Sequence, residues 1–101
     1  MKGYPILLLF IIVFLPTLHA QEEQYSTKSR RAAESFNDAM KQYRIREYEK
    51  ALDKIEDALD RDDEFIEAYI VRGQIYEAQG TNSKALESYR EAISIDPDFF
   101  P

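Results

Sequence analysis

The chain has 101 residues, of which 45% are hydrophobic and 32% charged, with a formal net charge of −6, no cysteine and one histidine. A chain of this length forms one small domain. The lack of cysteine excludes disulfides and thiol nucleophiles, and the acidic balance argues against a nucleic acid as partner, because phosphate backbones call for clustered Lys and Arg.

The first predicted element is a secretory signal peptide over residues 1–20. Ten apolar residues, 6–15, follow Lys2, and a small residue, Ala20, precedes a polar run. A helix of ten apolar residues extends only about 15 Å, against a hydrocarbon core of about 30 Å, so a stable membrane span is not expected. We expect cleavage after Ala20 and export to the periplasm or the cell envelope, with secretion or a retained anchor as the alternatives.

Cleavage at this point also removes His19, which is the single histidine. The remaining chain has neither histidine nor cysteine and therefore cannot form a Ser-His-Asp triad or a usual zinc site. The acidic run 60–64 lacks the alternating ligands and central glycine of a calcium loop. We expect no catalytic residue, no metal and no cofactor, and hence a protein that is not an enzyme.

A polar lead-in, residues 21–31, follows the signal peptide, and its residues 21–29 are expected to be flexible. Ser26, Thr27 and Ser29 are candidate caps of the first helix. The chain then repeats itself, because residues 32–65 align with 66–99 after a shift of 34 positions. The identical pairs gather at small and apolar positions. They are Lys50/Lys84, Ala51/Ala85, Leu52/Leu86, Ala58/Ala92, Asp62/Asp96 and Phe65/Phe99.

Apolar residues in both copies recur at intervals of three and four, which predicts four helices in two antiparallel pairs. In the first copy the two stripes are Ala32, Phe36, Ala39, Met40 and Tyr43, and then Ala51, Leu52, Ile55, Ala58 and Leu59. In the second copy they are Phe65, Tyr69, Gly73 and Tyr76, and then Ala85, Leu86, Tyr89, Ala92 and Ile93. Asp62 or Asp63 is the expected cap of the third helix, and Gly80 suits the left-handed residue that ends it.

This pattern resembles the tetratricopeptide repeat family. The motif residues of the second copy are Tyr69, Gly73, Tyr76, Gly80, Ala85, Tyr89, Ala92 and Pro97. The first copy departs from the pattern at Ser35, Arg46 and Asp63. The resemblance implies an all-α solenoid with one repeat over 32–65 and another over 66–99, while residues 100–101 begin a third.

Small residues at fixed positions are expected to let the helices of such a repeat approach closely. Gly73 and Ala85 would serve the contact within the second hairpin, and Ala92 the contact with the following unit. The full set of expected packing residues is Ala39, Ala51, Ala58, Gly73, Ala85 and Ala92. Phe99 and Phe100 then indicate either further repeats in the same chain or self-association, the alternative being that they fold back over the second repeat.

Function in this family lies in a concave groove lined mainly by the first helix of each repeat. The groove residues that the resemblance implies are Phe36, Met40 and Tyr43, with Arg44 beside them, and Ile70, Gln74 and Glu77. An alternative assigns Phe36, Met40 and Tyr43 to the core, because they form the one apolar stripe of their helix. Ile70 is expected to be exposed.

The expected function is a non-enzymatic scaffold for protein–protein interaction, exported to the periplasm or envelope, whose partner is a protein, bound through a peptide or helix. Nucleic acid is not an expected partner. The alternative is an N-terminal structural or targeting repeat segment of a longer outer-membrane-associated protein.

Overall fold

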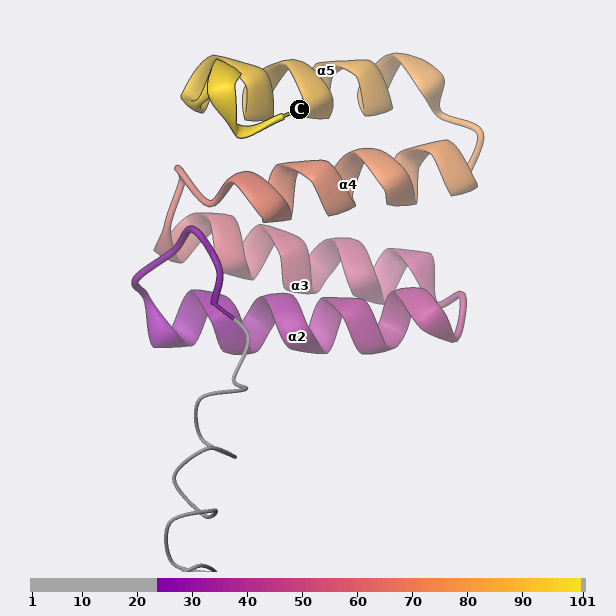
Figure 1. The fold of residues 1–101 in the computed structure, drawn as a ribbon. Helices are drawn as coiled ribbons and strands as arrows, with labels where there is room; N and C mark the ends of the chain where they lie inside the picture. The colour runs from indigo at the N-terminus through magenta and orange to yellow at the C-terminus, as the bar shows by residue number, and fades with distance from the viewer. Residues whose placement is uncertain (1–23, 101) are drawn as a thin grey trace, which may run out of the picture.

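The computed structural model describes residues 24–100, and the expected signal peptide lies outside them. These residues form four α-helices, α2 (Arg30–Arg44), α3 (Tyr48–Arg61), α4 (Ile66–Ala78) and α5 (Asn82–Ile95), and the 3₁₀ turn η1 (Pro97–Phe99). The helices stack in chain order as two antiparallel hairpins (Figure 1). The predicted all-α fold of two helix pairs is confirmed.

The two hairpins turn in the same way, although the first has arginine where the second has glycine. Gly80 follows α4 with φ of 78°, and Arg46 follows α2 with φ of 64°. The N–H of Gly80 donates to the carbonyl of Glu77 at 2.9 Å, and that of Arg46 donates to the carbonyl of Tyr43, also at 2.9 Å. The two turns therefore have the same shape. Arginine in place of glycine makes the first turn more strained than the second.

The core fills the first hairpin and the space between it and α4. Ala39, Ala51 and Ala58 are wholly buried, with 0% exposure. Ala92, which is expected to contact a following unit, is also wholly buried although no further hairpin covers α5 within residues 24–100. The complete cluster is Ala32, Phe36, Ala39, Ala51, Ile55, Ala58, Leu59, Phe65, Ala68, Val71 and Ile75.

Gly73 creates the close contact of the second hairpin. A Cβ atom at this position would lie 2.4 Å from Cε1 of Tyr89, which is inside van der Waals contact. The tyrosine ring of α5 therefore packs directly on the backbone of α4. Gly73 is small because of this ring, and Ala85 is almost fully buried, at 2% exposure, on the same helix as the ring.

Arg72 joins the second hairpin to the first. Its Nε donates to the Oγ of Ser88 on α5 at 3.0 Å, and its guanidinium pairs with Glu56 of α3 at 3.1 Å. The guanidinium also lies 5.0 Å from the ring centroid of Tyr69, whose pKa is raised mainly by burial. One side chain of α4 thus contacts both neighbouring helices and fixes the stacking of the two repeats.

Candidate functional site

The lead-in segment lies against the helices, and the expectation that it is flexible throughout is wrong for residues 24–29. The ring of Tyr25 lies 4.9 Å from that of Phe36 and 5.8 Å from that of Phe65. Its hydroxyl donates to Oδ1 of Asn37 at 2.7 Å. The segment leaves α2 and crosses to the neighbouring helices before it turns back (Figure 1). It therefore covers one end of the surface formed by α2 and α4.

Ser26 fixes the end of this crossing on α4. Its Oγ accepts a hydrogen bond from the N–H of Ile66 at 3.3 Å, and its own N–H and Oγ donate to the carboxylate of Glu67 at 2.9 and 2.5 Å. The predicted cap from Asp62 or Asp63 is wrong, because Asp62 lies too early in the turn and accepts from the N–H of Glu64. Ser29 caps α2, as one of the three candidates, by accepting from the N–H of Ala32.

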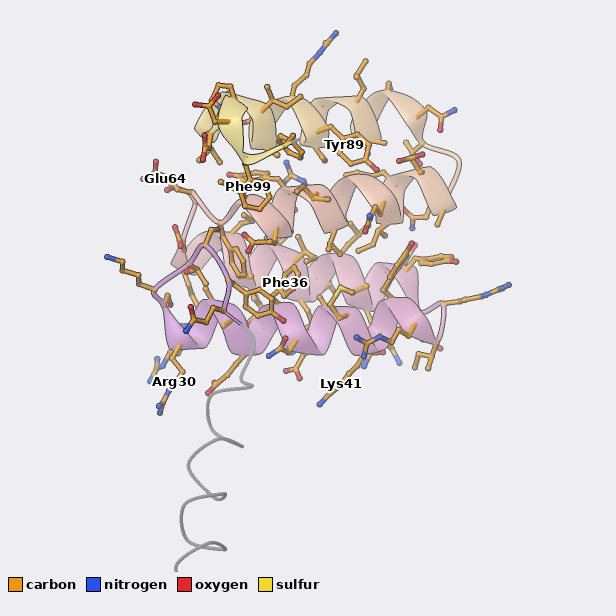
Figure 2. The ribbon with its side chains drawn as sticks, in the orientation of Figure 1. Arg30, Phe36, Lys41, Glu64, Tyr89 and Phe99 are labelled. Carbon is orange, nitrogen blue, oxygen red and sulfur yellow. The ribbon has the colours of Figure 1, made fainter. Side chains whose placement is uncertain are left out.

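Beside Tyr25 lies an open hollow of about 490 Å³ along α2. Phe36 is only 5% exposed and belongs to the core, so the alternative assignment holds for this residue. Met40 is half-buried and packs on the core from the wall of the hollow. Figure 2 shows Phe36 lying toward α3, while Lys41 points away from it. The lining residues are Tyr25, Phe36, Asn37, Met40, Lys41 and Arg44.

A second open hollow, of about 540 Å³, lies where the C-terminal halves of α2 and α4 face each other. Tyr43 contributes from α2, and Gln74, Glu77 and Ala78 contribute from α4. Tyr43 is half-buried against the core, whereas Gln74 and Glu77 are exposed. Three of the predicted groove residues are therefore brought together around one hollow. The prediction that Ile70 is exposed is not met, because this residue is half-buried.

Tyr89 of α5 contacts Glu77, a residue of this second hollow, because its hydroxyl donates a hydrogen bond to the Glu77 carboxylate. Partial burial, followed by this hydrogen bond and the negative charge of Glu77, raises the pKa of Tyr89 to about 12. The phenol of Tyr89 therefore stays protonated at neutral pH and remains a hydrogen-bond donor to Glu77. Glu77 is thus held in place by a tyrosine from the second helix of its own repeat.

The charges differ between the two hollows. Lys41 and Arg44 give the hollow beside Tyr25 a positive rim, whereas Glu77 gives the second hollow a negative wall. The side chains gathered here are amide, carboxylate, phenol, ammonium and guanidinium groups on the faces of helices. Such a set suits reversible binding through hydrogen bonds and charge pairs.

Sequence reasoning missed four residues of this surface, which are Tyr25, Ser26, Glu67 and Tyr89. The first two stand in a polar segment without periodicity, and Tyr89 was explained by its packing stripe alone. The sequence contained one signal of this contact. Phe65 occupies the N-cap position of α4, and its side chain cannot accept a hydrogen bond from the first backbone N–H groups of the helix. A cap from elsewhere in the chain was therefore required.

Comparison with known proteins identifies the repeat. The sequence model of the tetratricopeptide repeat family matches residues 66–99. The structure is similar to the crystal structure of PilW, described as a widely conserved type IV pilus biogenesis factor, with a TM-score of 0.67 and 38% sequence identity. That match covers 69% of this chain and 32% of the PilW chain, so the present chain corresponds to about a third of PilW.

None of the curated proteins matches this sequence. Between residues 24 and 100, every helix is too short or too polar to cross a bilayer.

Proposed function

Because this chain is a tetratricopeptide repeat protein, we propose that it is a non-enzymatic scaffold of the cell envelope. It binds a segment of a partner protein along the surface shared by α2 and α4. Tetratricopeptide repeats are interaction modules, and the concave side formed by their first helices is the side that suits an extended peptide or a helix.

The observation that carries this proposal is the second hollow, in which Tyr43 of one repeat faces Gln74 and Glu77 of the next. A surface built from two consecutive first helices is the minimum groove of such a solenoid. Gln74 is exposed and offers both a donor and an acceptor to a peptide backbone. Tyr43 offers an aromatic face that is already held against the core, so that little conformational entropy is lost on binding.

The charges narrow the partner to a segment that carries an acidic residue near one end. Arg44 is exposed in the last turn of α2, where it lines the hollow beside Tyr25. A guanidinium pairs with a carboxylate through two parallel hydrogen bonds. Lys41 lies one turn earlier on the same helix and adds positive charge. An acidic side chain or a C-terminal carboxylate of the partner fits this end of the surface.

An envelope location is supported by the leader sequence and by the similarity to PilW, which is described as a type IV pilus biogenesis factor. We extend the proposal accordingly to a role in assembling an envelope structure of this kind. Expression from Met1, followed by cell fractionation and N-terminal sequencing, tests the location. An envelope protein that begins at Gln21 is expected, and a full-length cytoplasmic protein would contradict export.

Site-specific photo-cross-linking in the native cell tests the binding surface. A cross-linking residue at Gln74, on the proposed surface, is expected to give a defined adduct with one partner. Lys54 is also exposed, on α3, and serves as the matched control that is expected to give no adduct. Arg44→Glu in the Gln74 background is expected to reduce the adduct. Equal adducts from Gln74 and Lys54 would place the binding surface elsewhere.

A further inference from the structure

The lead-in lies on the helices in the way that an extended peptide lies on a protein surface. Residues 24–29 form neither a helix nor a strand, and half-buried residues alternate along them with exposed ones. The half-buried residues are Tyr25, Thr27 and Ser29. Successive side chains of an extended chain point to opposite sides, so this alternation is typical of a segment with one side on a surface. Figure 1 shows the segment leaving α2 and turning back beside the neighbouring helices.

The surface under this segment is one end of the proposed groove. Glu67 stands three positions before Ile70, one of the predicted groove residues, so both lie on the same side of α4. Phe36 holds the place on α2 that corresponds to Ile70, 34 positions earlier. Ser26 binds Glu67, and the ring of Tyr25 lies 4.9 Å from that of Phe36. The lead-in therefore occupies groove positions of both repeats.

Tyr25 and Ser26 make the kinds of contact that hold a bound peptide. The ring of Tyr25 contacts the rings of Phe36 and Phe65, and these contacts favour an aromatic side chain at this place. The N–H of Ser26 donates to the carboxylate of Glu67 at 2.9 Å, which is a contact that any peptide backbone can offer. The hydroxyl of Ser26 accepts from the first N–H of α4 and also donates to Glu67. A hydroxyl group is suited to this place because it donates and accepts at once.

The part of the lead-in next to α2 is fixed separately from these contacts. Ser29 caps α2, and its own N–H donates to Oγ of Thr27 at 3.1 Å. Tyr25 and Ser26 can therefore leave the groove while the cap of α2 stays in place. The hydrogen bonds from Ser26 to Glu67 lie at exposed positions, where water competes for the same groups. A segment held by a few exposed hydrogen bonds opens without unfolding of the helices.

We propose that the lead-in is an intramolecular ligand of the groove, which a partner segment of the same chemistry displaces. The displacement rests on the proposed function, since the partner must use the same groove. The partner segment has an aromatic residue followed directly by serine or threonine, which replace Tyr25 and Ser26. Arg44 follows Phe36 by eight positions, or about 12 Å along α2, which about four extended residues span. The acidic residue that pairs with Arg44 therefore lies about four residues from the aromatic one.

The lead-in then limits the affinity for the partner. A segment tethered by a short linker has an effective concentration in the millimolar range and competes with any segment that arrives from solution. The partner binds only the molecules whose lead-in is open, so its apparent Kd is the intrinsic Kd divided by the open fraction. Loss of the Tyr25 and Ser26 contacts is therefore expected to strengthen binding of the partner.

Binding of a free peptide tests the displacement without the partner. The probe is a fluorescein-labelled peptide with the sequence of residues 21–29, and the released variant of the protein carries Tyr25→Ala and Ser26→Ala. Fluorescence anisotropy, with protein up to about 1 mM, measures binding to the parent and to the released variant. The peptide is expected to bind the released variant at least about tenfold more tightly, which corresponds to a closed lead-in in about nine-tenths of the parent molecules.

Matched variants make this measurement specific. A peptide with Tyr25→Ala and Ser26→Ala is expected not to bind. Glu67→Ala in the released variant is expected to abolish binding, whereas Glu64→Ala, at an exposed site just before α4, is expected to leave it unchanged. No binding to the released variant, or equal binding to it and to the parent, would overturn the proposal. Unfolding of the released variant, followed by circular dichroism, would also overturn it, because a segment that the fold requires is not a displaceable ligand.

Cross-linking from Gln74 in the cell tests displacement by the partner itself. The released variant is expected to give at least about threefold more adduct than the parent at an equal protein level. Gln24→Ala with Lys28→Ala changes two exposed residues of the same segment and is expected to leave the adduct unchanged. An adduct that stays equal or falls in the released variant would overturn the displacement and leave the proposed function intact. No adduct in either protein would overturn the proposed function, and displacement by a partner with it.

Discussion

Ser26 and Glu67 are 41 positions apart in sequence, yet both the N–H and the hydroxyl of the serine donate to the glutamate carboxylate, at 2.9 and 2.5 Å. Through the same hydroxyl, Ser26 also accepts from the N–H of Ile66 and so caps α4. The start of the second repeat is thus completed by a residue that precedes the first.

Ser26→Ala is expected to lower the free energy of unfolding by about 1 kcal/mol, the usual cost of losing a helix N-cap. Urea denaturation of the two proteins measures this difference. Ser94→Ala is the matched control, since this exposed serine only donates to a carbonyl of its own helix. Its replacement is expected to change stability by less than about 0.5 kcal/mol. Equal losses in both variants would mean that the lead-in does not hold α4.

Arg46→Gly is expected to stabilise the protein by about 1 kcal/mol. Arg46 adopts the left-handed conformation, with φ of 64°, and this conformation is strained in a residue that has a Cβ atom. Thermal unfolding followed by circular dichroism measures the rise. Gly80→Ala is the reciprocal variant and is expected to lose a similar amount. A Cβ at position 80 meets no atom within 4 Å, so that loss reports the backbone alone. A fall in stability for Arg46→Gly would contradict this account of the turn.

Gly73→Leu is expected to destabilise the protein by about 2–3 kcal/mol, because the side chain must displace the ring of Tyr89 that packs on this glycine. Chemical denaturation measures the loss. Ala78→Leu creates the same side chain at an exposed site on the same helix and is expected to have little effect. If both leucine variants unfold like the parent, the close packing of α4 and α5 is wrong, and the repeat assignment fails with it.

The stability of the protein is expected to fall between about pH 10 and about pH 12 because of Tyr89. Its folded pKa is about 12, against 10.0 for an ordinary tyrosine. The folded state therefore keeps a proton that the unfolded state loses in this range. The stabilisation is complete below pH 10 and disappears as the pH rises to 12.

Melting temperatures of the parent and Tyr89→Phe across this pH range isolate the effect, since the other tyrosines are common to both proteins. The difference in melting temperature is expected to narrow above about pH 10. Glu77→Gln removes the negative charge that faces the phenol, and is expected to lower the pKa of Tyr89 as followed by tyrosinate absorbance. A Tyr89 that titrates normally in the parent would show that the bond to Glu77 is absent in solution.

The sequence was sufficient to predict the helices and their pairing, because repeat contacts demand small residues at fixed spacing. Ala39, Ala51 and Ala58 are wholly buried, and Gly73 lies under a tyrosine ring. Gly80 has the expected left-handed conformation. Each of these positions is set by local helix geometry or by contact with the adjacent helix, and both leave a periodic pattern in the sequence.

The contacts of the lead-in could not be predicted in this way. Tyr25 and Ser26 bind residues far along the chain, and one aromatic and one hydroxyl side chain carry no period that identifies their partners. Phe36 shows the same limit within a helix, because an apolar residue near the edge of a stripe suits the core and the groove equally well. The contacts of its ring with those of Tyr25 and Phe65 show that it belongs to the core.

The hydrophilic side of α2 also affects self-association of the protein at high concentration. Arg31, Glu34 and Lys41 precede the buried residues Phe65, Ala68 and Ile75 by 34 positions each, and all three are exposed and charged. They therefore correspond to the side of α4 that packs on the preceding repeat. A contact between unlike ends of identical subunits does not close on itself and leads to open-ended filaments. The charged groups on α2 therefore disfavour such an open-ended contact, although the opposite side of the stack exposes Leu86, Ile93 and Phe99.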